Sequence, residues 1–286
     1  TGRRLNEVFK GKFTLSLNQN LSMITDGLTI KAQGAYDIDS YFSENRLLNP
    51  PLFQAIGRDK DGNLITVQRV SEGAISYGRG SDRYRKYHFE STLNYERVFN
   101  KDHRISGLVY YYLSDQKKAS DATNNLTAIP LRYQGVSSRL TYGFKDTYMA
   151  DFNFGYTGSE NFQPGKQYGF FPSIAVGWVP TGYQFFQRKF PFINFLKFRG
   201  SYGTVGNDRI SSTRFPYLTM VNMGYGYPWD SSAGFETIGE SRIGADNLKW
   251  EKAKKSNLGI EARLFNEKLS LVVDIFNDRR DGIFMQ

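Results

Sequence analysis

The sequence predicts an all-β fold, an antiparallel transmembrane β-barrel segment of about ten strands with long extracellular loops. Three observations predict it. Apolar and polar residues alternate with period two in several segments, which is the side-chain period of a strand. Short polar turns join most of these segments in pairs. Long stretches rich in Gly, Asn, Ser, Asp and Pro separate the pairs, and such asymmetry between short turns and long loops is typical of outer-membrane barrels.

Composition narrows the classes of protein. The chain has 286 residues, a net charge of +9, 19 Tyr, 23 Phe, two His and no Cys. Without Cys, a disulfide scaffold and a Cys-ligated metal site are excluded. No apolar stretch reaches the roughly 20 residues of a membrane-spanning helix. The basic residues are scattered and accompany no nucleic-acid-binding motif, so we expect no nucleic-acid partner.

Four hairpins are predicted in chain order. Phe13, Leu15 and Leu17 alternate with polar residues before the turn Asp26-Gly27, and Leu28, Ile30 and Ala32 alternate after it. Asp-Gly favours a tight hairpin because both residues tolerate positive φ. The other hairpins are 87–99 with 104–114 through Asn100-Lys101-Asp102, 136–144 with 148–156 through Lys145-Asp146-Thr147, and 254–265 with 269–279 through Asn266-Glu267.

The third hairpin has the clearest alternation. Tyr148, Ala150, Phe152, Phe154 and Tyr156 share one predicted face, and Asp151, Asn153 and Gly155 share the other. Single strands at about 169–179 and 196–205 bring the count to ten. No amphipathic helix is predicted, and 40–86, 115–135, 158–168 and 206–253 are predicted as long loops.

Strand length and aromatic position favour a membrane. The predicted strands have roughly 10–13 residues, close to the roughly 9–11 that cross a bilayer with tilt. Aromatic residues lie near strand ends, where an interfacial girdle would place them: Tyr36, Phe99, Tyr142, Tyr148, Tyr156 and Trp178. A β-sandwich or solenoid would also alternate, and the loop asymmetry favours the barrel.

Several motifs then resemble one family. They are Thr25-Asp26-Gly27-Leu28-Thr29-Ile30-Lys31, Pro164-Gly165, Tyr168-Gly169-Phe170-Phe171-Pro172-Ser173, Leu196-Lys197-Phe198-Arg199-Gly200-Ser201-Tyr202-Gly203 and Asn247-Leu248-Lys249-Trp250-Glu251. In this order they resemble the barrel of SusC/RagA-type TonB-dependent outer-membrane transporters of Bacteroidetes. The resemblance covers nearly the whole chain.

The resemblance implies a location and partners. Residues 1–286 would be part of the β-barrel domain of the 22-stranded type, with neither a plug domain nor a signal peptide. The function would be that of a wall segment of an outer-membrane importer for oligosaccharides or peptides. A SusD-like surface lipoprotein would cap the barrel, the TonB complex would act through the missing N-terminal region, and outer-membrane lipid would surround it.

Two other function classes remain open at this point. The chain would be a complete ten-stranded outer-membrane enzyme, protease-like, if a carboxylate–His constellation stood at the barrel mouth. It would be a secreted β-rich sugar-binding or adhesion module if it stayed monodisperse without detergent. We expect no enzyme, because the isolated His88 and His103 lack a placed nucleophile or third partner.

Candidate binding residues lie in one loop. Asp59-Lys60-Asp61-Gly62-Asn63 lacks the Gly and Glu positions of a calcium loop and is predicted as a hairpin turn. No metal site, cofactor or catalytic residue is expected in the chain. Tyr225, Tyr227 and Trp229 are rings among Gly and Asn, a setting that suits sugar faces or peptide side chains. We expect them to bind substrate, with packing against other loops or against a lipoprotein cap as the alternative.

Overall fold

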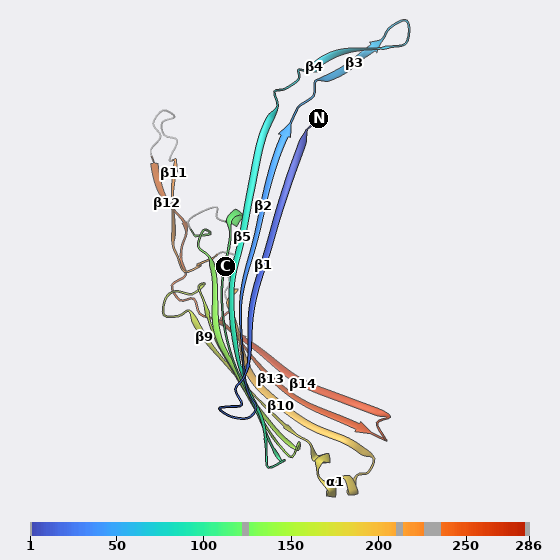
Figure 1. Ribbon diagram of the computed structural model, residues 1–286, viewed down its shortest axis with the longest axis vertical. Coiled ribbons are helices and arrows are strands. Elements are labelled where there is room, and N and C mark those ends of the chain that lie inside the picture. The colour runs from blue at the N-terminus through green and yellow to red at the C-terminus, as the bar shows by residue number, and fades with distance from the viewer. Residues whose placement is uncertain (1, 122–125, 210–213, 226–235, 284–286) are drawn as a thin grey trace. The chain divides into compact units, whose positions relative to one another are not determined.

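The computed structural model describes residues 2–121, 126–209, 214–225 and 236–283, which are mainly β-structure. Ten strands form the main sheet: β1 (Arg3–Asn20), β2 (Leu28–Leu47), β5 (Ser76–Phe99), β6 (His103–Lys118), β7 (Leu131–Phe144), β8 (Tyr148–Ser159), β9 (Tyr168–Trp178), β10 (Ile193–Asn207), β13 (Glu251–Leu264) and β14 (Leu269–Asp281). Their order is β1-β2-β5-β6-β7-β8-β9-β10-β13-β14 (Figure 1). The predicted all-β class and ten-stranded antiparallel sheet are therefore confirmed.

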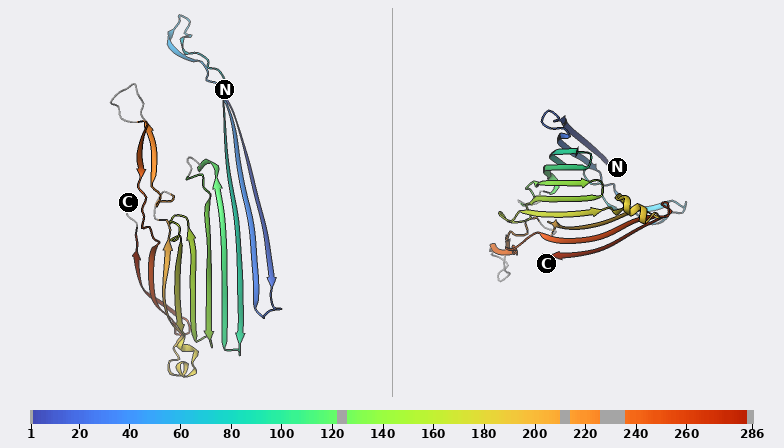
Figure 2. Two further views of the ribbon diagram at one scale, coloured as in Figure 1. Left: turned by 90° about the vertical axis from the view of Figure 1, so that its left-hand side faces the viewer. Right: turned by 90° about the horizontal axis from the view of Figure 1, so that it is seen from below.

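Each strand of the sheet pairs with its neighbours in chain order, with two short hairpins inserted between them. Figure 2 shows adjacent strands side by side with opposite directions. The antiparallel register runs from Phe144↔Tyr148 to Tyr133↔Ser159 for β7 with β8. It runs from Leu264↔Leu269 to Lys252↔Asp281 for β13 with β14.

Three of the four predicted tight turns are confirmed. The fourth, at Asp26-Gly27, lies inside a longer connection, because β1 ends at Asn20 and β2 begins at Leu28. Gly27 has φ 85°, and the pairs Asn100-Lys101, Lys145-Asp146 and Asn266-Glu267 have φ between 49° and 65°. Tight hairpin turns require positive φ, which Gly adopts freely and Asn and Asp tolerate better than other residues. At the three tight turns, these residues fix where the strands end.

Two predictions about the connections are wrong. Region 40–86 is not one irregular loop, because β2 continues to Leu47, β5 begins at Ser76, and β3 (Leu52–Arg58) and β4 (Leu64–Val70) form a hairpin between them. β3 and β4 are exposed along their whole length, so neither strand has a buried face that would impose an apolar–polar alternation on its sequence. Region 206–253 likewise contains the paired strands β11 (Met220–Tyr225) and β12 (Glu236–Arg242).

The connection between β9 and β10 holds short helices that the sequence did not predict. They are a 3-10 turn η2 at Pro180–Gly182 and α1 at Gln184–Lys189, and η1 (Ala119–Asp121) follows β6. Pro180 at the first position suits a helix start, since Pro lacks the N–H that is unpaired there. Six residues are too few to show an amphipathic period.

The residues group into two compact units. The first is formed by residues 2–13, 35–87 and 116–130, and the second by residues 14–34, 88–115 and 131–286. In the first unit, the β3–β4 hairpin closes on Asp59, whose carboxylate accepts from the backbone N–H groups of Asp61 (2.9 Å) and Asn63 (2.8 Å). The Asn63 side-chain amide, together with these backbone donors, holds the pKa of Asp59 below its ordinary value. The predicted hairpin turn at 59–63 is therefore confirmed.

Candidate functional site

One face of the second unit carries large apolar side chains. Directly paired residues of an antiparallel sheet share a face, and Phe152 on β8 pairs with Leu140 on β7 and Ile174 on β9. On β13, Leu258 pairs with Ile275 and is 66% exposed. We call this the apolar face; its members include Leu140, Tyr148, Phe152, Tyr156, Ile174, Val176, Trp178, Phe198, Leu258, Ile260, Val273 and Ile275. Exposed apolar surface of this extent marks contact with a membrane or another protein.

Aromatic rings bound this face at both ends. Toward the turns, Trp178 stacks on Phe198 with ring centroids 5.7 Å apart. Toward the loops, Tyr156 stacks on Tyr168 at 5.0 Å. On β8, Tyr148 and Tyr156 are roughly 27 Å apart along the strand at about 3.4 Å per residue. This separation agrees with an apolar band about 25 Å tall between two aromatic girdles.

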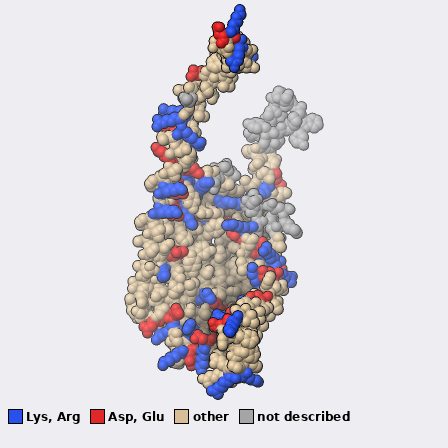
Figure 3. All heavy atoms as spheres, turned by 90° about the vertical axis from the view of Figure 1, so that its right-hand side faces the viewer, with Lys and Arg blue, Asp and Glu red and all other residues tan. Residues whose placement is uncertain are grey.

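The opposite face, which we call the polar face, is held by ion pairs that cross between strands. The Arg139 guanidinium on β7 donates to the Asp151 carboxylate on β8 at 2.8 Å. Arg199 on β10 lies between Glu261 of β13 at 2.9 Å and Asp274 of β14 at 2.7 Å. Basic and acidic side chains lie interspersed over the side of the molecule drawn in Figure 3. These half-exposed pairs suit a hydrated surface, where charges keep their water.

The two histidines also have polar partners, which the sequence did not reveal. His88 lies 3.2 Å from the Glu90 carboxylate, which also accepts from the Tyr110 hydroxyl at 2.9 Å. His103 Nδ1 lies 2.8 Å from the Tyr142 hydroxyl. Among the described residues, no group of three or more His, Asp and Glu is placed to hold a metal ion. No helix in that part of the chain has the length and apolar character to cross a membrane.

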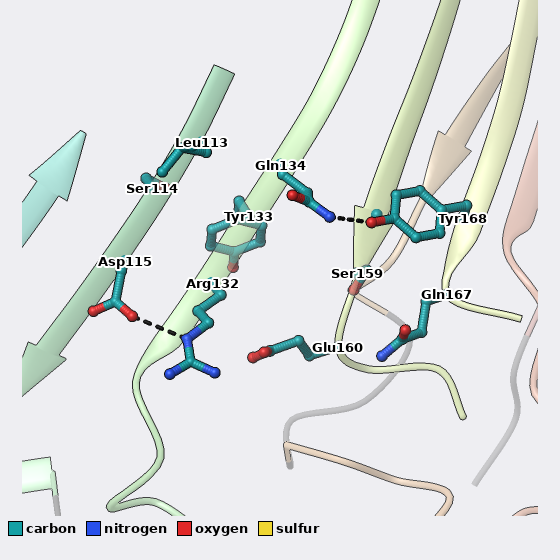
Figure 4. A pocket seen from close by; sticks show the side chains of 11 residues that line it. Leu113, Ser114, Asp115, Arg132, Tyr133, Gln134, Ser159, Glu160, Gln167 and Tyr168 are labelled. Carbon is teal, nitrogen blue, oxygen red and sulfur yellow. Dashed lines mark hydrogen bonds and ion pairs between the residues drawn. The ribbon is translucent and has the colours of Figure 1, made fainter. Parts of the chain in front are cut away.

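A pocket of about 370 Å³ lies where β6, β7, β8 and β9 reach the loops (Figure 4). The Arg132 guanidinium donates to Asp115 at 2.9 Å, and the Gln134 amide donates to the Tyr168 hydroxyl. Glu160 lies between Arg132 and Gln167 in this view. We call this the rim pocket.

Two buried carboxylate oxygens of the rim pocket accept no hydrogen bond from the described residues, Asp115 Oδ1 and Glu160 Oε2. The second of them lies 3.8 Å from the Arg214 guanidinium, in an ion pair. A buried acceptor left unsatisfied costs free energy. The side chains of Asp115 and Glu160 line the pocket, and a rotation of either carboxylate would present an acceptor to hydroxyl or amide donors of a ligand. The rim pocket therefore has the chemistry to bind a polar ligand rich in donors.

The β8–β9 connection, β9 and the segment just before β13 meet beside this pocket. Phe162 is fully buried and stacks on Trp250 at 5.0 Å, and Phe171 meets the same indole edge-on at 5.1 Å. Leu248 completes the cluster, and the Trp250 N–H donates to the Gln167 carbonyl at 3.2 Å. We call Phe162, Phe171, Leu248 and Trp250 the loop core. It shows that the Leu248–Glu251 motif positions loops by packing.

Tyr225, Tyr227 and Trp229, the predicted binding residues, belong neither to the rim pocket nor to the loop core as the structure describes them. Tyr225 is the last residue of β11, and its backbone pairs with Glu236. Tyr227 and Trp229 lie outside the residues that the structure describes. Tyr217, from the same predicted loop, packs against the loop core. The rim pocket was not among the predicted sites.

Comparison with known proteins agrees with this architecture. The family profile described as "TonB dependent receptor-like, beta-barrel" matches residues 2–286. TonB-dependent receptor P39 of Formosa agariphila is 26% identical over 237 residues, which cover 75% of this chain and 22% of the relative. TonB-dependent receptor SusC of Bacteroides thetaiotaomicron is 28% identical over 148 residues, covering 51% of this chain and 14% of the relative.

Solved structures show the same fold. A chain of the RagAB peptide transporter aligns with a TM-score of 0.61 at 20% identity, covering 96% of this chain and 30% of that one. This chain thus spans less than a third of each of these relatives. The resemblance to SusC/RagA-type proteins inferred from the motifs is confirmed. With the family profile matching from residue 2 to residue 286, the chain belongs to the TonB-dependent receptor β-barrel family.

Proposed function

We propose that this chain forms part of the wall of a TonB-dependent importer for oligosaccharides or peptides in a bacterial outer membrane. A SusD-like surface lipoprotein would cap the barrel, and the TonB complex would supply energy through a plug region of the full-length protein. Residues 1–286 would all belong to the barrel domain. The family is one of receptors, and no catalytic role is assigned to any residue.

The two-faced sheet is the observation that carries this proposal. A strand that separates lipid from a water-filled lumen needs apolar residues on one side and polar residues on the other. Phe152 and Ile174 lie on the apolar face, whereas Asp151 and Arg139 lie on the polar face. The apolar face is bounded by aromatic rings at both ends. The names of the relatives, among them a peptide transporter, support import as the activity.

Side-chain direction gives the sharpest test of the membrane assignment. Ile174 and Ala175 are neighbours on β9; Ile174 lies on the apolar face, while Ala175 pairs with Asp151 on the polar face. An arginine at a mid-membrane lipid position costs roughly 2–4 kcal/mol. We therefore expect Ile174→Arg to reduce the amount of folded full-length protein in the outer membrane, and Ala175→Arg to be nearly neutral. Equal tolerance of both variants would exclude a lipid-facing apolar face.

Topology is tested in intact cells, since the chain contains no cysteine. In our proposal the β3–β4 turn is extracellular and the turn at Asn100–Asp102 is periplasmic. A membrane-impermeant thiol reagent should label Lys60→Cys but not Lys101→Cys. Lysed cells serve as the control, because both positions are then accessible. The reverse labelling pattern would contradict the proposed orientation.

We assign substrate contact to Tyr225, Tyr227 and Trp229 and to the rim pocket. The triple change Tyr225→Ala, Tyr227→Ala and Trp229→Ala should weaken substrate binding while leaving barrel assembly intact, with each lost ring contact worth about 1 kcal/mol. Glu160→Gln should weaken binding of a donor-rich ligand, because the Glu160 carboxylate lines the rim pocket and an amide is the weaker acceptor. Normal uptake by the triple variant would reduce those rings to packing residues.

A further inference from the structure

A cluster of lysines lies at the loop end of the apolar face. Along β13, residues two apart share a face, so Lys254 and Lys252 follow Leu258 and Ser256 in the direction of the loops. The register agrees, since Lys254 pairs with Arg279 and Lys252 with Asp281 on β14. The face therefore changes from apolar to basic within about two such steps.

The lysines line a hollow that arises where two strands separate. Pairing of β9 with β10 ends at Ser173↔Gly203, whereas β10 and β13 remain paired as far as Asn207↔Glu251. The hollow measures about 700 Å³. Its lining residues used here are Lys166, Lys249, Lys252, Lys254, Tyr168 and Phe170; we call it the lysine hollow.

Charge in the lysine hollow is poorly balanced. Asp281 is the one acidic residue in the described part of the chain that lines it, and its carboxylate lies 2.7 Å from Lys254. Among the described residues, Lys166 reaches uncharged oxygens, the Asp246 carbonyl at 3.5 Å and the Asn247 side chain at 3.4 Å. Lys249 and Lys252 are exposed, and no carboxylate within the described ranges lies at ion-pair distance from them. On the polar face, by contrast, Arg139 and Arg199 each meet a carboxylate.

We propose that the lysine hollow binds the phosphate-bearing headgroup of an anionic outer-leaflet lipid whose acyl chains lie on the apolar face. The inference rests on the proposed membrane-facing role of that face. Ammonium groups bind phosphate as point charges, and a free headgroup would not need the apolar surface that continues directly from the hollow. Tyr168 and Phe170 add ring surface at the boundary, where amphipathic aromatic residues are favoured.

The test compares lipid binding by matched charge variants of the full-length protein in detergent, measured by native mass spectrometry. The probes are lipid A with two phosphates and the same glycolipid with its phosphates removed. A lysine near an anionic surface contributes about fivefold to affinity, so Lys249→Gln/Lys252→Gln should weaken binding of the phosphorylated form by about 25-fold. The control Lys197→Gln/Lys255→Gln removes the same charge from the polar face and should stay within about twofold.

Several results would overturn the inference. They are unchanged affinity in the Lys249/Lys252 variant, equal binding of the dephosphorylated lipid, or displacement of the lipid by inorganic phosphate at the lipid's own concentration. Loss of a copurifying acidic protein with lipid binding unchanged would assign the lysine hollow to a protein partner instead. The Ile174→Arg result separates the two proposals. If that variant fails to fold into the membrane while the lysine variants bind lipid normally, the wall assignment stands and only the headgroup site is wrong.

Discussion

The two ends of the sheet in the second unit differ in the balance between backbone and side-chain contacts that hold them. At the turn end, backbone groups bond to backbone groups of the neighbouring connection: Glu96 N–H to Gly27 O at 3.0 Å, Lys145 N–H to Asp102 O at 2.8 Å, and Val179 N–H to Thr147 O at 2.8 Å. Exposed ion pairs such as Lys145–Asp102 at 3.8 Å accompany these backbone bonds. At the loop end, the Ser159 N–H bonds to the Gln167 carbonyl at 3.0 Å, and half-buried side chains add most of the other links. Ser159 bonds to Asp208 at 2.8 Å, and the guanidinium of Arg242 donates to the carbonyls of Phe215 and Leu218.

This difference predicts different sensitivity to mutation. Where backbone bonds backbone, what matters is the φ and ψ that a residue adopts and the room for its Cβ. Where side chains make the links, chemical identity and volume matter. The turn end should therefore respond to glycine exchanges and the loop end to truncation of large side chains.

The largest effect is expected in the loop core. Trp250→Ala removes an indole that is 9% exposed and should cost about 3–5 kcal/mol of local stability. Limited proteolysis of the segment between β8 and β9 should become faster, because Phe162 loses its stacking partner. Trp250→Phe is the control and should retain part of the protection. An unchanged cleavage rate in the alanine variant would mean that the loop end is held by its hydrogen bonds alone.

A smaller effect should follow from Gly27→Ala. A Cβ at Gly27 would stand 1.9 Å from the Glu96 carbonyl oxygen, in addition to the strain of φ 85°. Gly165, at the loop end, has φ 88°, but no atom lies within 4 Å of the place that a Cβ would take. Gly165→Ala should therefore cost only the conformational penalty, about 1–2 kcal/mol, and Gly27→Ala clearly more. Urea unfolding of the full-length protein in lipid vesicles measures both, and equal losses would refute a steric role for Glu96.

Lys101→Gly should slightly stabilise the turn end. Lys101 has φ 65°, a conformation that costs an L-residue about 1–2 kcal/mol, but glycine also loses more entropy on folding. A net gain below about 1 kcal/mol is expected in the same urea experiment. Lys60→Gly, outside the positive-φ positions, should give no gain. A loss in the Lys101 variant would show that its side chain contributes to stability.

The smallest effect concerns pH and the β3–β4 turn. The pKa of the Asp59 carboxyl is lowered in the folded turn by the Asn63 side-chain amide. The stabilisation of the folded turn by the ionised Asp59 carboxylate is therefore present above the unfolded pKa and is lost as the pH falls through the folded pKa. NMR titration should give Asp59 a lower pKa in the native protein than in the Asn63→Ala variant. Identical values would remove the amide as the cause.

The strands and most of the turns could be predicted from the sequence, because period-two alternation and turn residues are local patterns. The alternation around Phe152 and Asp151 indicates, within one strand, which face each side chain occupies. The residues Asn266-Glu267 indicate a turn at their own position. The contacts of the loop core could not be predicted from the sequence, since nothing near Trp250 indicates that it packs against Phe162. The Asp115–Arg132 pair was hidden for the same reason, because the segment between β6 and β7 sets a register that alternation does not encode. Tyr225, Tyr227 and Trp229 were chosen for residue type alone.

The order of strands has a consequence for how the sheet is built. Strands β7 and β8 are joined through residues 145–147, while β10 and β13 are joined only across residues 208–250. Because loop-closure entropy grows with the logarithm of length, bringing the second pair together costs about 2 kcal/mol more. The β10–β13 seam should therefore form after the hairpins on either side of it. Packing of Trp250 onto Phe162 would then stabilise the pairing of β10 with β13 once it has formed.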